Sequence, residues 1–202
     1  MNETMEKRFH AEIECRAASD GSGDLILAGY AAVFDVETER WPGFREVVRR
    51  GAFAESLQND DVLALWVHDY SQPLGRKSGG TLTLEEDGHG LRVEIRMANT
   101  VINQNRYSDV QRGTVKGMSF GFIAHPDGQR FSSLVNGAEL RELTRVKLLE
   151  VSPHTDPQYE ETSIEARAKV DAQRPKQAEK PAEVPVEVQH AQARAVLMAY
   201  EL

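Results

Sequence analysis

The sequence is short of cysteine, of aromatic residues and of long hydrophobic runs. Its single cysteine, Cys15, cannot form an internal disulfide, so the fold is not built on a disulfide framework. No stretch approaches the roughly 18 apolar residues that span a bilayer, and the first ten residues lack the apolar centre of a secretory signal. We therefore expect a soluble protein, without a membrane partner, in a reducing cytoplasm.

Basic charge is also scarce, because 24 Lys and Arg residues stand against 32 Asp and Glu residues, for a net charge of -8. Nucleic-acid-binding domains usually carry a basic stripe, so no direct nucleic-acid binding is expected. The sequence has no cysteine pair for zinc, no GxxxxGK[ST] phosphate loop and no GxSxG elbow. No metal and no cofactor are expected.

What the sequence does contain is a series of short, β-prone segments with turn signals between them. Alternating or continuous apolar residues predict strands, and Thr100 and Gly113 are suitable ends for a helix. Many strands and few long helices favour a mostly β fold. A closed or nearly closed antiparallel β-barrel with a few short helices would leave so many strands without exposed edges. The expected strands are residues 8–17, 24–35, 45–49, 61–68, 80–97 (a hairpin), 114–125 and 138–152, and the expected helices are 52–58 and 101–112.

The composition changes near Arg167. Residues 168–188 are rich in Pro, Lys, Glu, Gln and Ala and have no apolar period, which is typical of a linker or flexible tail. Residues 189–202 could form a short amphipathic helix, marginal in isolation. The predicted organisation is a globular domain over 1–167, a linker over 168–188 and a terminal helix over 189–202.

A serine lies between glycines in the predicted strand at 114–125. In Gly117–Gly121 (GMSFG), alternation places Met118 and Phe120 on one face and Ser119 with the glycines on the other. Glycine weakens a strand interior, so it needs a reason. One reason is a peptide that approaches the backbone beside an accessible serine hydroxyl; another is tight packing at a barrel corner. The spacing alone leaves both open.

Of the six histidines, His68 is the best placed to act as a base. It ends the apolar stretch at 61–68, where a half-buried ring at a sheet rim can titrate near neutrality. The alternative is a core-edge histidine bonded to a backbone carbonyl. Neighbours on a strand point to opposite faces, so Asp69 is expected to be a turn residue rather than the carboxylate that orients His68.

A third functional group is expected from the segment that follows residue 148. If this segment is extended, Glu150, Ser152 and His154 share one face. A carboxylate there could hold the imidazole of His68 in one tautomer, and His154 could do the same less strongly. The alternatives are an ordinary edge-strand glutamate and a loop histidine.

Taken together, six segments resemble the prohead protease family of tailed bacteriophages, whose fold is related to the herpesvirus capsid-maturation protease. They occur in the family's order and span most of residues 10–165. The segments are GYAAVFD (29–35), FREVVRRGAF (44–53), ALWVHDYSQPLGR (64–76), SGGTLTL (78–84), GMSFGF (117–122) and LLEVSPHTDP (148–157).

The resemblance implies a serine endopeptidase with His68 as the base, Ser119 as the nucleophile and Glu150 as the third member. The chain departs from the family at His154, where an aliphatic residue is usual. The related herpesvirus enzymes use a second histidine as third member, so His154 stays as the alternative to the favoured Glu150. No oxyanion donor can be assigned, and the nearby cation Arg141 is expected on the surface.

The same resemblance implies substrates and a setting. The substrates would be the major capsid protein's scaffolding segment, a separate scaffold and the protease itself, cleaved inside the assembling prohead in the host cytoplasm. Herpesvirus relatives work as dimers, which leaves a homo-oligomer open. Two rivals remain: a non-catalytic capsid-interior scaffold that kept the protease fold, and an unrelated β-barrel binding module.

Overall fold

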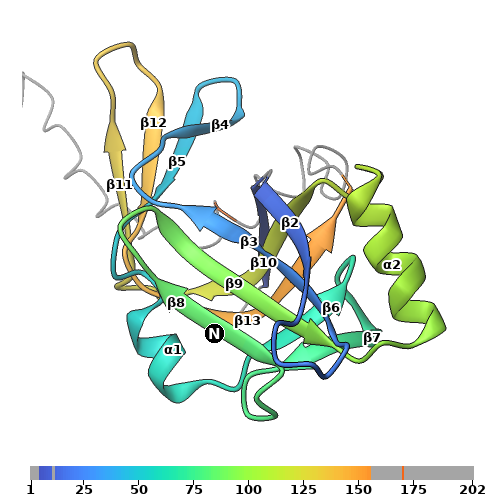
Figure 1. Cartoon of the computed structure of the whole chain (residues 1–202). Helices are drawn as coiled ribbons and strands as arrows, with labels where there is room; N and C mark the ends of the chain where they lie inside the picture. Colours follow the sequence, from blue (N-terminus) through green and yellow to red (C-terminus); the bar gives the residue numbers. More distant parts are fainter. Residues whose placement is uncertain (1–4, 11, 156–169, 171–202) are drawn as a thin grey trace, which may run out of the picture.

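A computed structural model describes residues 5–10, 12–155 and 170, which form thirteen strands and two helices (Figure 1). The helices are α1 (Ala54–Asn59) and α2 (Val101–Gln111). The strands are β1 (Glu6–His10), β2 (Glu12–Ala17), β3 (Leu25–Val33), β4 (Thr38–Trp41), β5 (Phe44–Val48), β6 (Leu63–Trp66), β7 (Asp69–Arg76), β8 (Leu82–Glu86), β9 (Gly90–Met97), β10 (Gly117–Ala124), β11 (Gln129–Ser133), β12 (Glu139–Leu143) and β13 (Val146–His154).

These strands form three sheets. Sheet A has the order β1-β10-β13-β6-β7, sheet B the order β2-β3-β9-β8, and sheet C the order β11-β12-β5-β4. In Figure 1, β3 and β9 of sheet B lie across β10 and β13 of sheet A, while sheet C extends to one side. Strands β1 and β2 are adjacent in sequence but belong to different sheets, so the chain passes from sheet A to sheet B between them.

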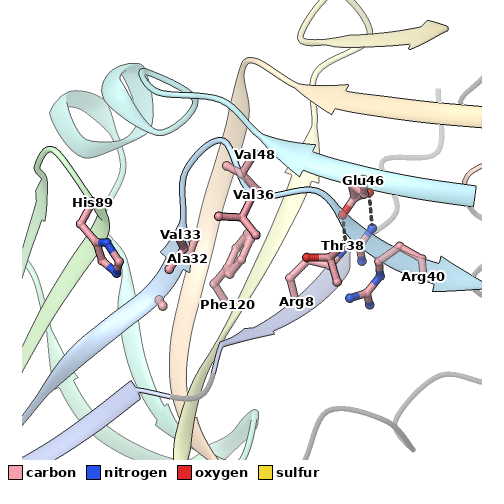
Figure 2. Close-up of a pocket in the computed structure, with 11 residues that line it drawn as sticks. Arg8, Ala32, Val33, Val36, Thr38, Arg40, Glu46, Val48, His89 and Phe120 are labelled. Carbon is pink, nitrogen blue, oxygen red and sulfur yellow. Dashed lines mark hydrogen bonds and ion pairs between the residues drawn. The ribbon is translucent and has the colours of Figure 1, made fainter. Parts of the chain in front are cut away.

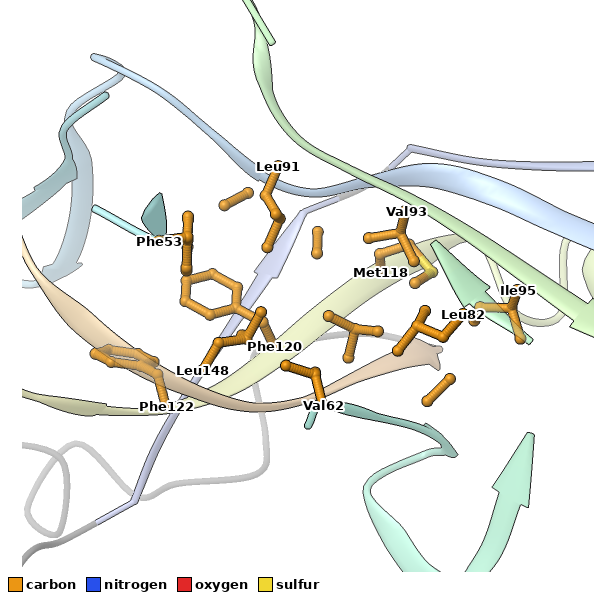
Figure 3. Close-up of a cluster of buried hydrophobic side chains, with 14 of the residues drawn as sticks. Phe53, Val62, Leu82, Leu91, Val93, Ile95, Met118, Phe120, Phe122 and Leu148 are labelled. Atoms are coloured by element: carbon orange, nitrogen blue, oxygen red, sulfur yellow. The ribbon is translucent and has the colours of Figure 1, made fainter. Parts of the chain in front are cut away.

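The main hydrophobic core fills the space between sheets A and B (Figure 3). Met118, Phe120 and Phe122 of β10 contribute one side of it, and Val93 and Ile95 of β9 contribute the other. All five side chains are at most 2% exposed. The alternation read from the sequence is therefore confirmed for β10: its large apolar side chains point into the core, which leaves Ser119 on the opposite face.

Several predicted elements are confirmed. The hairpin at 80–97 is β8 and β9, and the helix at 101–112 is α2, where the Thr100 hydroxyl accepts from the Asn103 amide at 3.4 Å. Gly113 ends this helix with φ 74°. The expected strand at 8–17 is instead two strands, β1 and β2. Strands β4, β7 and β11 were not expected, because their short polar sequences carry no clear alternation.

The expected closed antiparallel barrel is not confirmed. The backbone pairing of the described residues closes none of the three sheets. Two pairs are also parallel rather than antiparallel, β5 with β12 and β6 with β13. Parallel neighbours come from segments far apart in the chain, so no local hairpin signal predicts them. The coarser expectation, a mostly β fold with a few short helices, is confirmed.

The predicted linker at 168–188 and helix at 189–202 lie outside the described residues, apart from Val170. Val170 is 1% exposed and packs with Trp41 and Phe44, whose rings stack with centroids 4.2 Å apart. At this one position the segment is packed on sheet C rather than solvated. Within the described part of the chain, no helix is long and apolar enough to cross a membrane.

Candidate active site

The candidate base lies in the tight turn between β6 and β7. Trp66 pairs with Asp69, which leaves Val67 and His68 as a two-residue hairpin turn. Both have positive φ, 47° and 62°, as a type I′ turn requires. His68 was expected to end a strand; it lies in the turn instead. A valine at positive φ is strained, and the backbone amide of Val67 donates to the Pro153 carbonyl of β13 at 3.3 Å.

A carboxylate and a hydroxyl of β13 hold this histidine. The Nδ1 atom of His68 lies 2.7 Å from Oε1 of Glu150. Ser152 connects the two residues, because its hydroxyl donates to Oε2 of Glu150 at 2.5 Å and accepts from the His68 backbone amide at 3.2 Å. Glu150 and Ser152 are fully buried. The sequence placed Ser152 on the same face as Glu150 but gave no sign of this double role.

The nucleophile candidate faces this group across the β10–β13 ladder. Ser119 pairs with Ser152, and Gly121 pairs with Glu150. A Cβ atom at Gly121 would lie 2.2 Å from Oε1 of Glu150 and 2.1 Å from the Met5 side chain. Glycine is therefore required here because the Glu150 carboxylate lies directly against the backbone of β10.

Ser119 is not accessible in this structure. It is 2% exposed, and its hydroxyl donates to the backbone carbonyl of Arg8 at 2.9 Å. The sequence suggested an open serine because the glycine-lined face of β10 carries no large side chains of its own. Strand β1 pairs along the edge of β10 and its Arg8 carbonyl binds the Ser119 hydroxyl. Pairing between distant segments is not visible in a local pattern.

The alternative third member also lies beside the base. His154 pairs with Gly117, so it shares the face of Ser119 and Glu150. The rings of His154 and His68 have centroids 5.3 Å apart and are tilted by 39°. The Nδ1 atom of His68 is nevertheless bonded to Glu150, so the carboxylate is the group placed to fix the tautomer of this ring.

Asp69 is a turn residue, as expected. Its carboxylate accepts from the Ser71 hydroxyl at 2.6 Å, the Gln72 amide group at 2.6 Å and the Ser71 backbone amide at 2.8 Å. These hydrogen bonds lower the pKa of Asp69. Cys15 packs against the core, and burial raises the pKa of its thiol to about 11, so it stays a protonated, unreactive group at neutral pH.

A buried charge cluster lies behind β1, where sheet A meets sheet C. We call it the Glu6–Arg141 cluster; its members are Glu6, Arg8, Glu46 and Arg141. Arg141 was expected on the surface, but it is 0% exposed. Its guanidinium binds both carboxylate oxygens of Glu6 at 2.7 and 2.8 Å and lies 3.1 Å from Glu46. Arg8 binds Glu6 at 2.7 Å and also Glu46.

The Arg8–Glu46 pair also borders a pocket of about 180 Å³ between β10 and the β3–β5 segment (Figure 2). Phe120, Val36 and Val48 contribute apolar walls to it. None of Ser119, His68 and Glu150 lines this pocket, so it is separate from the candidate catalytic group. Among the described residues, no group of three or more His, Cys, Asp or Glu side chains is arranged to hold a metal.

The chain was compared with solved structures, with curated proteins and with family models. A solved structure of the bacteriophage T4 capsid assembly protease, gp21, is 12% identical, covers 75% of this chain and 99% of its own, and aligns with a TM-score of 0.46. No curated protein matches. The family model described as caudovirus prohead serine protease matches residues 11–177, a range that includes Ser119, His68 and Glu150. The chain belongs to the caudovirus prohead serine protease family.

Proposed function

We propose that the chain is a serine endopeptidase that cleaves capsid and scaffold proteins during prohead maturation, with Ser119, His68 and Glu150 as its catalytic residues. The observation that carries this proposal is the 2.7 Å contact between His68 and Glu150, one strand away from Ser119. A nucleophile, a base and a group that orients the base are the parts that acyl transfer needs.

The chemistry follows from these positions. An ionised Glu150 accepts from Nδ1–H of His68, so Nε2 is the nitrogen that takes a proton. His68 removes the hydroxyl proton of Ser119 as its Oγ attacks a peptide carbonyl carbon. His68 then gives that proton to the leaving amine, and an acyl-enzyme remains. Water, deprotonated by His68, then attacks the ester carbonyl; His68 returns the proton to Oγ of Ser119 as the ester bond breaks, which frees Ser119 and the new carboxyl terminus.

The substrates we propose are the scaffolding segment of the major capsid protein, a separate scaffold, and this chain's own residues 168–202, whose composition predicts a linker and a short terminal helix. A chain without packed structure enters a protease site far more readily than a folded strand. The enzyme would act in the host cytoplasm, inside the assembling prohead, with neither cofactor nor nucleic acid.

The first experiment compares cleavage by the wild type, Ser119→Ala and Ser133→Ala. Ser133 is an exposed serine on β11 in sheet C, so its substitution is the matched control. Intact-mass measurement of each purified chain should show a shortened C-terminus for the wild type and the control. Ser119→Ala should keep its full mass and cleave at least roughly a thousandfold more slowly. Undiminished cleavage by Ser119→Ala would rule out this nucleophile.

The rival that one observation favours is a non-catalytic scaffold. A serine that is 2% exposed and bonded to a backbone carbonyl is closed to substrate as it stands. A fluorophosphonate probe, which modifies only activated serines, separates the two functions. A scaffold without chemistry would stay unlabelled even after β1 is detached, whereas a protease would then be labelled at Ser119.

A further inference from the structure

Strand β1 occupies the place beside the nucleophile strand that an extended peptide would take. It pairs antiparallel with β10, with Phe9 opposite Ser119 and Lys7 opposite Gly121. Without β1, β10 would be the edge of sheet A. Exposed sheet edges commonly bind extended peptides by accepting them as an added strand. The range that matches the family begins at residue 11, after β1 ends.

Contacts from β1 and Met5 cover the site itself. The Arg8 carbonyl accepts a hydrogen bond from the Ser119 hydroxyl at 2.9 Å, so the Arg8–Phe9 peptide bond lies against the nucleophile. The Met5 side chain lies over Gly121, and its sulfur is 4.0 Å from the Tyr70 hydroxyl. In this arrangement the hydroxyl is bonded to the carbonyl oxygen instead of to the base, so the contact is non-productive.

The side chains that anchor β1 form a separable half of the Glu6–Arg141 cluster. Glu6 and Arg8 belong to β1, whereas Glu46 and Arg141 belong to β5 and β12. Each half has one positive and one negative charge. If β1 leaves, Arg141 still binds Glu46 at 3.1 Å and Gln129 at 2.9 Å. The departure of β1 therefore leaves no unbalanced charge buried in the fold. An unbalanced buried charge is what makes the removal of one ionic partner costly.

We infer that β1 is an intramolecular pseudo-substrate: it fills the substrate-strand position along β10, and only the fraction of molecules in which β1 has moved away is active. This inference rests on the proposed protease function. The vacated edge accepts an extended peptide in the register of β1. Its chemistry selects an acidic residue that reaches Arg141 and, two residues later, a basic residue that reaches Glu46.

The test measures how fast a fluorophosphonate labels Ser119 in three full-length chains: wild type, Glu6→Lys and Glu14→Lys. Lysine at position 6 faces Arg8 and Arg141 and detaches β1. Glu14 is exposed on β2 in sheet B, so Glu14→Lys makes the same charge change away from the site. A closed fraction lowers the apparent rate in proportion, so Glu6→Lys should label at least about tenfold faster than the other two.

A peptide supplies the second measurement. A synthetic peptide of residues 4–11 should slow the labelling of the Glu6→Lys chain, and a peptide with Glu6 and Arg8 exchanged should slow it much less. If Glu6→Lys does not keep a cooperative urea transition, the milder Glu6→Gln takes its place, with a smaller increase expected.

The possible results test the pseudo-substrate role and the proposed protease function separately. Equal labelling of all three folded chains overturns the pseudo-substrate role and leaves the protease function standing. Labelling of none of them overturns both. Faster labelling of Glu6→Lys that both peptides slow equally overturns the charge selectivity.

Discussion

One buried hydroxyl, that of Ser152, supports two catalytic candidates at once. It accepts from the backbone amide of His68 and donates to the carboxylate of Glu150. The first bond helps to hold a residue at φ 62°, and the second leaves Oε1 of Glu150 to bind the imidazole. Ser152 therefore fixes the backbone of His68 relative to the carboxylate of Glu150.

Replacing Ser152 with Ala should lower kcat by roughly 10 to 100-fold with little change in KM, because a base displaced by less than an ångström loses alignment. The backbone amide of His68 and the carboxylate of Glu150 would also lose a hydrogen-bond partner. This loss should lower the unfolding free energy by about 1–3 kcal/mol. Steady-state kinetics and urea unfolding measure both effects. Ser152→Thr keeps the hydroxyl and should recover much of the activity; an unchanged kcat in Ser152→Ala would contradict the positioning role.

The choice of third member is also testable residue by residue. Glu150→Gln preserves shape but presents an amide to Nδ1 of His68, so it should lower kcat by roughly 10³ to 10⁴-fold. His154→Gln should keep most of the activity, because Glu150 already binds that nitrogen. The opposite ranking of the two variants would make His154 the orienting group.

At the residue scale, strand alternation in the sequence correctly predicted which side chains share a face of β10 and of β13. It placed Ser119 opposite Met118 and Phe120, and it placed Glu150, Ser152 and His154 on one face; the register of β10 and β13 agrees. It could not predict the burial of Arg141, because the carboxylates that neutralise this cation come from positions 6 and 46.

At the scale of elements, the β6–β7 turn shapes the site by forcing two residues into the left-handed region. Such a turn favours Asn or Gly at its first position, yet this chain has Val67 there. The strain that results acts on the residue directly before the candidate base. An apolar stretch that ends in histidine looks like a strand end, which is why the turn itself was not predicted.

Replacing Val67 with Asn should raise the unfolding free energy by about 1 kcal/mol, because asparagine adopts positive φ more easily than a β-branched residue. Urea unfolding measures the change. A loss of similar size would show that the Val67 side chain contributes more by packing than it costs in backbone strain.

The stability that strand β1 adds to the fold depends on pH through the carboxyl group of Glu6. Burial acts to raise the pKa of Glu6, but the charge of Arg8 and the hydrogen bonds of Arg141 outweigh it and lower the pKa from 4.5 to about 2. Glu46, which faces the same arginines, is shifted in the same direction. A carboxylate with a lowered folded-state pKa stabilises the fold fully above pH 4.5 and loses this effect as the pH falls toward 2.

Glu6→Gln should therefore cost on the order of 3 kcal/mol of unfolding free energy at neutral pH, since one pKa unit corresponds to about 1.4 kcal/mol. The difference from wild type should shrink steadily as the pH falls from 4.5 toward 2. Urea unfolding across this range measures it. A difference that does not change with pH would mean that Glu6 is not held as a carboxylate.

For the whole molecule, the three sheets meet at the candidate site. Sheet A supplies Ser119, His68 and Glu150, sheet B closes the core behind β10, and sheet C supplies Glu46 and Arg141 to anchor β1. Local patterns predicted the hairpin and the capped helix. They did not predict how the strands assemble, because parallel pairs such as β6 with β13 join segments more than 80 residues apart. The resemblance to the family came instead from six motifs that occur in the family's order.

The most direct test of the central claim maps the serine that a fluorophosphonate modifies, by peptide mass spectrometry. The chains to compare are wild type, Glu6→Lys, and Glu6→Lys combined with His68→Gln. We expect an adduct on Ser119, formed fastest in Glu6→Lys and lost when His68 is replaced. An adduct on another serine, or undiminished labelling of Ser119 without His68, would contradict it.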